Sequence, residues 1–371
     1  MSAPASRERR PETSMLMVPE IFSSLGGISR VMRLYLKAMS DEACETGGKV
    51  KLVALNDSHL DSRDQKKYSN LTLADWIVCA RDKKRFINAA LKRSGDCDTL
   101  ICGHIAQLPV ALAASLLNWR LKYYLVAHGI EVWRPYTWLE RRALRGTRRL
   151  LAVSEYTRRQ VLRFHPALPA DRVIVVPNAL DPFFSPVTEQ ADVAVPFAGP
   201  RILTVSRLTT ADSYKGIDTL IEALPAVRRD LPFSQLRIAG HGDDVPRLTA
   251  LAARLGVTAA VNFLGAVSDE ALRTEYATCD LFALPSRREG FGLVYLEAMS
   301  HGKPCIAARA GGAPEVVNET VGRLVDYGDI PGLAAAVAEL TRQPCESGVV
   351  RRHAGTFDFP AFLQRLAAAL N

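Results

Sequence analysis

The sequence predicts an α/β protein built from two doubly wound domains. At 371 residues the chain exceeds the roughly 250–300 residues that usually share one hydrophobic core, so two domains are expected. Short apolar runs that suit buried strands alternate with helical patterns along the chain. Several of these runs end in glycine, histidine or charged residues, and open α/β sheets bind ligands at such strand ends.

Composition narrows the class of protein. Hydrophobic residues make up 48% and charged residues 23%, which is ordinary for a globular protein without long disorder. No apolar stretch reaches the roughly 18–20 residues that a membrane-spanning helix needs. Residues 1–13 are polar, unlike an export signal, and predict a disordered leader in a cytoplasmic protein. The seven cysteines form no CxxC pair, which favours reduced thiols over disulfides or a zinc site.

Positive charge is concentrated in the first half of the chain. Residues 1–185 contain 29 Lys and Arg against 18 Asp and Glu, a net charge of +11, and the remaining residues have a net charge of −3. Such a basic half suits an anionic membrane surface, a diphosphate-bearing acceptor or nucleic acid.

The first domain is expected over residues 14–185. Met15–Pro19 predicts a strand, and a loop with Gly26 and Gly27 precedes a helix over Ile28–Met39. This order starts a Rossmann-like unit. Without the full GxGxxG pattern, however, the glycine pair fits a tight turn as well as it fits phosphate binding.

Two further strands of this domain end in histidine. Asp98–Cys102 predicts a strand followed by His104, and Lys122–Ala127 predicts a strand followed by His128 and Glu131. A lone histidine is more often structural. Because an HGxE turn at a strand end is a common ligand position, a functional role for His128 is expected about as much as a structural one.

Two basic segments lie in the same domain. The helix predicted over Arg81–Arg93 carries Phe86, Ile87 and Leu91 among its charges, so it suits an anionic lipid surface or an ordinary solvated face equally well. Arginine recurs eight times over Arg141–Arg163, without the interleaved aromatic residues of single-strand nucleic-acid platforms. A lipid or phosphate surface is therefore preferred over nucleic acid.

A proline-punctuated stretch over 186–200 predicts the linker to a second domain over 201–355. The second domain opens with the strand Ile202–Val205, followed by Arg207 and then by Lys215 at a helix start. Two cations beside a helix N-terminus suit a diphosphate. The alternative, two solvated bases, does not explain why both flank one strand-to-helix loop.

The stretch from Pro285 to Val317 has the most specific pattern. Leu281–Leu284 predicts a strand and Leu293–Ser300 a helix, so Glu289 lies in the loop between them and Glu297 in the helix. Glycines at a helix start leave N–H groups open to an anion, and a nearby carboxylate suits sugar hydroxyls. The pattern favours a sugar phosphate or nucleotide sugar; the alternative is a solvated helix face with turn-forming glycines.

Glu289 and Glu297 have seven residues between them, and GGAPEVV follows over 311–317. This stretch resembles the EX7E signature of retaining glycosyltransferases of the GT-B fold, family 4. The resemblance covers nearly the whole chain and includes the SRL and KG elements around Arg207 and Lys215. The sequence departs from the family at Ala179, where a glycine is usual, which puts the backbone angles of that loop in question.

The resemblance implies two Rossmann-like domains that face each other across a cleft, with a helix over 356–371 that crosses back to the first domain. It implies that Arg207 and Lys215 stabilise the leaving diphosphate, that Glu289 contacts the transferred sugar and that Glu297 binds ribose hydroxyls. Front-face attack is the usual picture of retention, and a double displacement with an enzyme carboxylate stays open.

Further site residues follow from the same resemblance. The other donor-binding residues are Gly26, Gly27, Gly240, Gly242, Phe263, Gly290, Phe291, Gly292 and Leu293. His128 joins the catalytic group, and the acceptor side comprises His104, Glu131 and Ser154. No metal or other cofactor is implied. Asp96 and Asp98 spell DxD but precede a strand, so we interpret this match as chance.

Similarity to bacterial surface-polysaccharide transferases favours GDP-mannose as the donor, followed by a UDP-hexose. The implied acceptor is a glycan or a polyprenyl-diphosphate-linked oligosaccharide, at the inner face of the plasma membrane. Two other classes remain open: a sugar-nucleotide 2-epimerase of the same fold, and a non-catalytic module that binds membrane or nucleic acid.

Overall fold

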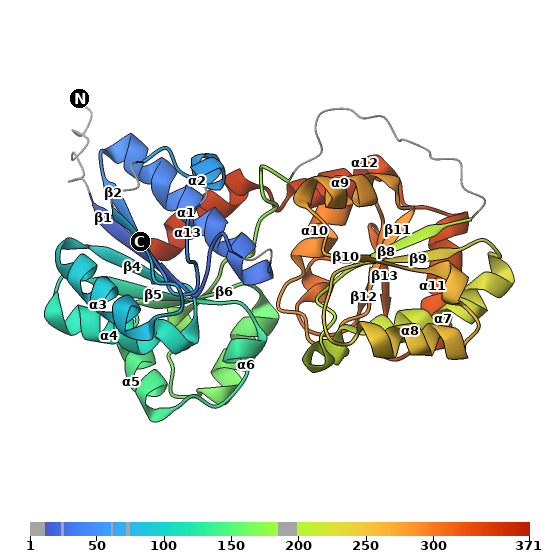
Figure 1. Ribbon diagram of the computed structural model, residues 1–371. Helices are drawn as coiled ribbons and strands as arrows, with labels where there is room; N and C mark the ends of the chain where they lie inside the picture. The colour runs from blue at the N-terminus through green and yellow to red at the C-terminus, as the bar shows by residue number, and fades with distance from the viewer. Residues whose placement is uncertain (1–11, 24–25, 61, 72–74, 185–198) are drawn as a thin grey trace, which may run out of the picture. The chain divides into compact units, whose positions relative to one another are not determined.

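The computed structural model describes residues 12–23, 26–60, 62–71, 75–184 and 199–371. Most of the predicted leader (1–13) and linker (186–200) lies outside these residues. The chain divides into two compact units: the first comprises Met1–Val153, Thr157–Val176 and Leu363–Asn371, and the second Ser154–Tyr156 and Pro177–Phe362. The predicted α/β class is confirmed, because each unit contains one parallel sheet with helices on both faces (Figure 1).

The first unit contains a seven-stranded sheet with the order β3-β2-β1-β4-β5-β6-β7, in which all neighbours pair in parallel. Its strands are β1 (Thr13–Val18), β2 (Lys49–Ala54), β3 (Trp76–Val78), β4 (Thr99–Cys102), β5 (Lys122–Ala127), β6 (Arg149–Ala152) and β7 (Val173–Val175). The central strands β1, β4 and β5 are apolar and buried over most of their length, as expected of strands covered on both faces.

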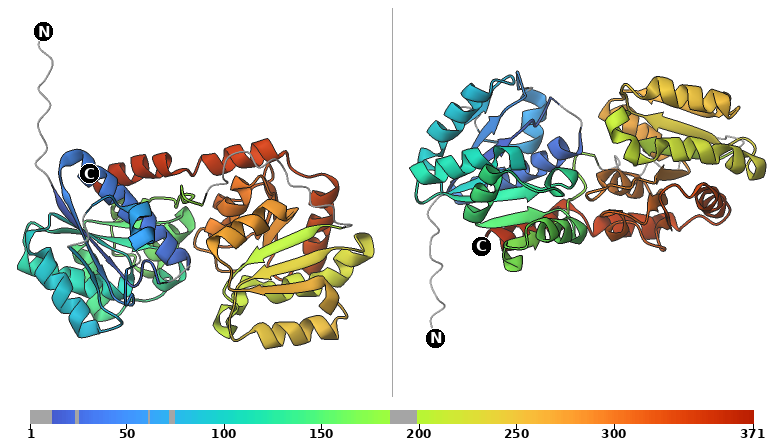
Figure 2. Two further views of the ribbon diagram at one scale, coloured as in Figure 1. Left: turned by 45° about the horizontal axis from the view of Figure 1, so that its top comes forward. Right: turned by 90° about the horizontal axis from the view of Figure 1, so that it is seen from below.

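The helices of this unit alternate with its strands along the chain. They are α1 (Gly27–Thr46), α2 (Ser62–Tyr68), α3 (Lys83–Arg93), α4 (Leu108–Leu117), α5 (Trp138–Gly146) and α6 (Glu155–Phe164), of which the first two residues are grouped with the second unit. α1 packs with α2 on one face, and α3, α4 and α5 form a packed row on the other (Figures 1 and 2). Right-handed crossovers require this change of face where the chain reverses its direction along the sheet.

Helix ends differ from the predicted ones for local reasons. α1 runs past the predicted end at Met39 to Thr46 and stops where Gly47 adopts a left-handed φ of 71°. α3 starts at Lys83 rather than Arg81, because the Asp82 carboxylate accepts the backbone N–H groups of the helix's first turn at 2.9 and 3.0 Å.

The second unit contains a six-stranded parallel sheet with the order β10-β9-β8-β11-β12-β13. Its strands are β8 (Arg201–Val205), β9 (Gln235–Ala239), β10 (Val261–Gly265), β11 (Leu281–Leu284), β12 (Cys305–Ala308) and β13 (Gly322–Val325). Its helices are α7 (Ile217–Asp230), α8 (Val245–Arg254), α9 (Asp269–Thr278), α10 (Leu293–Ser300), α11 (Ile330–Arg342), α12 (Ser347–Gly355) and the first residues of α13 (Phe359–Leu370). α7 packs with α8 and α11, and α10 packs with α12.

The last residues of α13 belong to the first unit. There the Tyr124 hydroxyl donates a hydrogen bond to the Leu370 carbonyl at 2.9 Å, and Arg149 donates to the Ala369 carbonyl at 2.7 Å.

Each sheet has one point at which the chain reverses its direction across the sheet. The reversal falls between β1 and β4 in the first unit and between β8 and β11 in the second. The loops that follow two such neighbouring strands diverge to opposite faces, and the space outside their carboxyl ends is where α/β proteins bind ligands. The predicted residues Arg207, Lys215 and Glu289 all lie in the loops after β8 and β11.

Candidate functional site

Two loops of the second unit meet at its switch point. Lys215 lies after β8 and Glu289 after β11, and the Lys215 Nζ lies 2.7 Å from the Glu289 Oε2. Gly216 permits this approach: its φ is 74°, and a Cβ there would lie 2.6 Å from the Pro285 carbonyl oxygen. The structure therefore brings together two predicted catalytic residues that are 74 positions apart in the sequence.

Arg207 lies in the same loop as Lys215 and reaches solvent, with 70% of its side chain exposed. Its Nη2 lies 3.1 Å from an oxygen of the buried Asp212, which also accepts hydrogen bonds from the Thr209 hydroxyl at 2.7 Å and the Tyr214 hydroxyl at 2.8 Å. Burial and the hydrogen bond to Asp212 raise the pKa of Tyr214, so its hydroxyl remains a donor. Asp212 was not predicted as a site residue; its only signal in the sequence is its place between the predicted cations Arg207 and Lys215.

Gly240 and Gly242 let the loop after β9 pack on the segment that carries Arg207. A Cβ at Gly240 would lie 1.7 Å from the Ser206 carbonyl oxygen, and one at Gly242 would lie 2.1 Å from the Leu208 carbonyl oxygen. Any side chain at either position would displace this segment. The predicted contact of these glycines with the donor stays a prediction.

The loop from Glu289 to Leu293 leads into α10. Gly292 has a φ of 98°, and a Cβ there would lie 2.3 Å from the Tyr295 ring, so glycine is required for this turn. The Phe291 ring is buried and lies 5.6 Å from the Phe357 ring, centroid to centroid. Phe291 would therefore offer a ligand its backbone N–H, as would Gly290, and the first N–H groups of α10 have no partner within the helix.

Glu297 and Phe263 are the remaining donor predictions in this unit. Glu297 is only 4% exposed, and its Oε2 accepts a hydrogen bond from the Tyr276 hydroxyl at 2.9 Å. A ribose would have to share this carboxylate with Tyr276. Phe263 is half-buried in β10, the edge strand of the sheet. Both assignments stay predictions.

In the first unit, the predicted histidines follow the neighbouring strands β4 and β5. The His128 Nε2 lies 3.0 Å from the Gly103 carbonyl, which can only accept, so Nε2 carries the proton and Nδ1 presents a lone pair. That Nδ1 has no hydrogen-bond partner among the described residues. Burial lowers the pKa of His128 to about 4, so the ring is neutral at physiological pH.

The other two acceptor predictions in this unit already have backbone partners. Glu131 Oε1 accepts the N–H groups of His128 and Gly129 at 2.5 and 3.1 Å, and burial raises its pKa. His104 accepts the Ala106 N–H at 3.1 Å through Nδ1, and burial lowers its pKa. Whether they contact an acceptor stays a prediction, but both shape the strand ends that carry His128.

The glycine loop after β1 depends on a buried carboxylate that sequence analysis missed. Asp57, fully buried just beyond β2, accepts the backbone N–H groups of Ile21, Phe22 and Ser23, each at 2.9 Å. The loop then reaches Gly26, the N-cap of α1, and Gly27, where a Cβ would meet nothing within 4 Å. Packing against the described residues therefore does not require glycine at position 27.

Ser154 differs from the other predicted acceptor residues in the unit to which it is assigned. It is grouped with the second unit, it is fully buried, and its hydroxyl donates to the Gly290 carbonyl at 2.7 Å. The two aspartates of the DxD match also have structural partners: Asp96 pairs with Lys51, and Asp98 accepts the Thr13 N–H at 3.1 Å.

The two basic segments differ in how their side chains are used. In Arg141–Arg163, the side chains of Arg141, Arg149 and Arg158 donate to backbone carbonyls and thus hold the fold together. On α3, by contrast, Lys84, Arg85 and Lys92 have no side-chain hydrogen bond or ion pair to any described residue.

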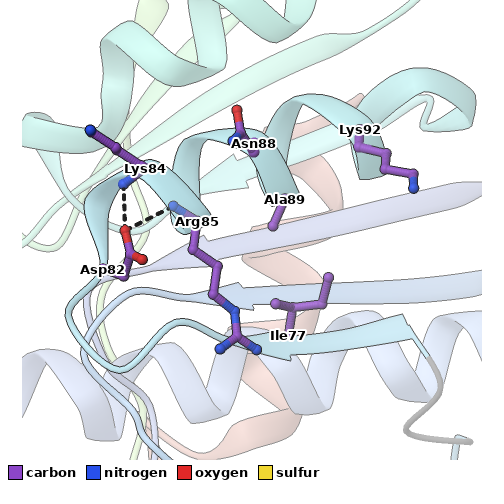
Figure 3. A pocket seen from close by; sticks show the side chains of 7 residues that line it. All are labelled: Ile77, Asp82, Lys84, Arg85, Asn88, Ala89 and Lys92. Atoms are coloured by element: carbon purple, nitrogen blue, oxygen red, sulfur yellow. Dashed lines mark hydrogen bonds between the residues drawn. The ribbon is translucent and has the colours of Figure 1, made fainter.

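These three cations line a pocket of about 580 Å³ between α3 and the edge strand β3. Figure 3 shows Arg85 extending from α3 past Ile77 on β3, with Ala89 and Lys92 further along the helix. The loop that enters α3 is strained, because Ala80 and Arg81 have φ values of 48° and 69°.

An exposed apolar group next to α3 was missed by sequence analysis. Leu116, Leu117 and Trp119 at the end of α4 are 76%, 71% and 86% exposed. Asn118 between them donates to the carbonyls of Ser94 and Cys97 at 2.9 and 2.7 Å, which ties this group to the end of α3. The apolar run of α4 was the only signal, and it did not reveal which side chains face solvent.

Two further surveys cover the described residues only. No group of three or more His, Cys, Asp or Glu side chains there is placed to hold a metal ion. In the same residues, no helix has the length and apolar character needed to cross a bilayer.

Comparison with known families decides the relationship. A model described as Glycosyltransferase Family 4 matches residues 25–183, and one described as Glycosyl transferases group 1 matches residues 199–343. Over 263 residues the chain is 34% identical to a GDP-mannose-dependent alpha-(1-6)-phosphatidylinositol monomannoside mannosyltransferase of Mycobacterium tuberculosis, covering 66% of this chain and 67% of that protein. The chain belongs to glycosyltransferase family 4.

Other family 4 relatives match over shorter stretches. The Mycolicibacterium smegmatis protein of the same name is 39% identical, and the match spans 42% of this chain and 42% of that protein. A D-inositol 3-phosphate glycosyltransferase of Geodermatophilus obscurus is 35% identical over 60% of this chain and 52% of its own length.

Solved structures of glycosyltransferases share the fold. Anabaena HepE, solved in complex with UDP-glucose, matches with a TM-score of 0.76 at 22% identity over 96% of this chain and 99% of its own. A glycosyltransferase from Rickettsia africae matches with a TM-score of 0.78 at 18% identity over 96% and 97% of the two chains. The predicted GT-B fold of family 4 is thus confirmed.

Proposed function

We propose that the chain is a retaining glycosyltransferase that moves a hexose, mannose from GDP-mannose, to a glycan or lipid-linked glycan acceptor of a surface polysaccharide. The observation that carries this proposal is the Lys215–Glu289 pair, 2.7 Å apart at the switch point, with the exposed Arg207 in the same loop as Lys215. A diphosphate needs cations at a helix N-terminus, and a hexose needs a carboxylate beside them. The mannosyltransferase names of the relatives support GDP-mannose.

The chemistry follows from where charge develops. As the glycosidic bond breaks, negative charge grows on the leaving diphosphate, so Lys215 and Arg207 stabilise the transition state more than the ground state. Glu289 already holds Lys215 and would accept hydrogen bonds from the transferred sugar. His128 remains neutral because of its lowered pKa, and its Nδ1 lone pair suits a hydroxyl donor. Front-face attack, with the diphosphate taking the acceptor proton, fits these groups.

A thermal-shift panel of GDP-mannose, UDP-glucose, UDP-GlcNAc and the free nucleotides tests the donor. A ligand that binds only the folded state stabilises it by about 2.7 kcal/mol at 100 times its Kd, and we expect the largest rise in melting temperature with GDP-mannose. A larger rise with UDP-glucose would move the assignment to a UDP-hexose. No rise with any nucleotide sugar would contradict the proposal.

The anomeric configuration of the product tests retention, because an inverted anomer would exclude it. Incubation with UDP-GlcNAc alone tests the epimerase alternative, since only an epimerase would convert it.

We further propose that α3 and the end of α4 bring the protein to an anionic membrane surface, where a lipid-linked acceptor would lie. Lys84, Arg85 and Lys92 supply cations whose side chains make no hydrogen bond or ion pair with the described residues, and each basic residue near such a surface contributes about 1 kcal/mol. The exposed Trp119 suits the lipid–water interface, beside the exposed Leu116 and Leu117.

Vesicle co-sedimentation tests this surface. We expect binding to phosphatidylglycerol-containing vesicles that weakens with salt, is absent with pure phosphatidylcholine, and falls in Arg85→Ala and Trp119→Ser. Phe233→Ser, which removes a 59% exposed aromatic residue of the second unit, is the matched control. Equal binding by Trp119→Ser and Phe233→Ser would contradict the assignment.

A further inference from the structure

The peptide backbone after Glu289 is held by residues outside its own loop. The Gly312 N–H donates to the Glu289 carbonyl at 2.7 Å, and the Ser154 hydroxyl donates to the Gly290 carbonyl at 2.7 Å. Two successive carbonyl groups are therefore fixed by residues that are distant in the sequence. Ser154 is fully buried, so water does not compete for its hydrogen bond.

The glycine pair of the GGAPEVV segment makes this contact close. A Cβ at Gly311 would lie 2.4 Å from the Glu289 carbonyl oxygen, and one at Gly312 would lie 2.3 Å from the Gly290 carbonyl oxygen. Gly311 also has a φ of 64°, which favours glycine. The pair therefore packs directly against the backbone that carries Glu289.

Glu315, three residues further on, holds the segment that carries Ser154. Its two carboxylate oxygens accept the backbone N–H groups of Glu155 and Tyr156, each at 2.7 Å. Ser154–Tyr156 is grouped with the second unit, as are Glu315 and Gly290. The segment 311–315 therefore acts on the Glu289 loop in two ways. Gly311 and Gly312 contact the loop directly, and Glu315 holds the residues next to Ser154, which also contacts the loop.

We propose that Ser154, supported by Glu315, is a positioning residue that aims the backbone N–H groups of the Glu289 loop at the donor diphosphate. In a trans peptide the C=O group and the following N–H group point in opposite directions. Fixing the Glu289 carbonyl therefore fixes the Gly290 N–H, and fixing the Gly290 carbonyl fixes the Phe291 N–H.

This role deepens the proposed function and rests on it. Donors that are aimed before the reaction need no reorientation when charge develops on the diphosphate, so their effect appears in the rate of transfer. Without the hydrogen bond from Ser154, the peptide group after Gly290 could rotate, and it would have to be ordered again in each turnover. The role of Ser154 therefore differs from the acceptor contact that the sequence predicts for it.

Steady-state kinetics of Ser154→Ala with GDP-mannose, or with UDP-glucose should the panel prefer it, tests the role. We expect kcat to fall about tenfold or more, with KM for the donor and the affinity for free GDP or UDP changed much less. Ser234→Ala is the matched control: Ser234 is equally buried in the same unit, and its hydroxyl donates to the Leu231 carbonyl at 2.7 Å. Ser154→Thr, which keeps the hydroxyl, should recover much of kcat.

Two further measurements keep the proposal testable if Ser154→Ala folds poorly or the wild type is inactive. Glu315→Gln should lower kcat by a smaller factor, because one of its two acceptor oxygens is lost. Amide hydrogen exchange should be faster at Gly312 in both variants than in the wild type, and unchanged there in Ser234→Ala.

The outcomes separate the two proposals. If the wild type shows no transfer, the proposed function is contradicted. The positioning role is then judged by hydrogen exchange alone, and an unchanged exchange rate at Gly312 in Ser154→Ala and Glu315→Gln contradicts it. With an active wild type, equal kcat in Ser154→Ala and Ser234→Ala overturns the role. A loss confined to KM and nucleotide affinity also overturns it.

Discussion

The two sheets reverse direction in the same way, yet the loops at their switch points carry different chemistry. In the second unit Lys215 and Glu289 form an ion pair and Arg207 extends into solvent. In the first unit His128 is neutral, and Glu131 is occupied by two backbone N–H groups. One architecture therefore presents a charged site in one unit and a largely neutral one in the other.

This difference suits a division of labour. A diphosphate requires formal positive charge, whereas a sugar hydroxyl needs an acceptor with a free lone pair, which a neutral imidazole supplies without formal charge. At the switch point of the second unit, the charged site depends on an ion pair between two loops. At that of the first unit, burial keeps His128 neutral and backbone hydrogen bonds hold Glu131. Variants that change charge should therefore act mainly through the second unit, and changes of pH mainly through the first.

The largest effect is expected from breaking the ion pair of the second unit. Glu289→Gln and Lys215→Ala should each lower kcat/KM about 10²–10³-fold while the fold is kept, because each removes a charged group from the reacting centre. Glu275→Gln is a matched control, since the Arg237–Glu275 pair is 2.6 Å long and similarly buried, with side-chain exposures of 25% and 16% against 19% and 14%. Transfer kinetics would measure the fall in kcat/KM, and circular dichroism would show whether the fold is kept. Near-normal turnover in both Glu289→Gln and Lys215→Ala would contradict the proposed roles of these residues.

A smaller loss should follow when Arg207 is released from Asp212. Asp212→Asn weakens the acceptor of three hydrogen bonds, and hydrogen bonds to charged groups contribute about 1.5–3 kcal/mol. We expect KM for the nucleotide sugar and Kd for GDP to rise about tenfold, while GMP, which lacks the second phosphate, binds nearly as before. Calorimetric titration distinguishes the two nucleotides. An equal loss for GMP would show that Asp212 supports the fold and not the diphosphate contact.

The first unit should respond to pH instead. Folding lowers the pKa of His128 to about 4 from an ordinary value near 6.5, so the unfolded chain binds a proton at a higher pH than the folded chain. The stability that the neutral ring contributes is therefore fully present above pH 6.5 and is lost as the pH falls towards 4. Thermal melts of the wild type and His128→Gln between pH 7 and 4 should converge as the pH falls. Parallel curves would mean that His128 is not buried in this way.

Much of the fold was predictable because apolar runs determine buried strands and helices directly. The predicted bounds of β5, β11 and α10 agree with the structure. Arg207, Lys215 and Glu289 were predictable because they lie at strand ends in the pattern of a known family. The resemblance placed them at one donor site, but the contact between Lys215 and Glu289 depends on a pairing that is not local in sequence: β8 pairs with β11 as well as with β9, the strand that follows it.

The features that could not be predicted from the sequence depend on contacts between segments that are distant along the chain. Ser154 and Gly290 are 136 positions apart, so the resemblance placed Ser154 on the acceptor side but did not reveal its partner. Asp57 organises a loop more than thirty positions before it, and its sequence neighbours gave no sign of that role. Trp119 was predictable as apolar but not as exposed, because exposure depends on which helices pack beside α4.

The smallest effect concerns the departure from the family pattern at Ala179, which should alter neither site. Ala179 is buried, and among the described residues only Ala80 and Arg81 combine a positive φ with a side chain, so Ala179 sits in a conformation that alanine adopts without strain. Ala179→Gly restores the family residue but adds freedom to the unfolded chain, so we expect it to lower stability by about 0.4–1 kcal/mol with transfer unchanged. Urea denaturation and kinetics would measure both. A gain in stability would mean that this loop prefers the left-handed backbone that the family's glycine permits.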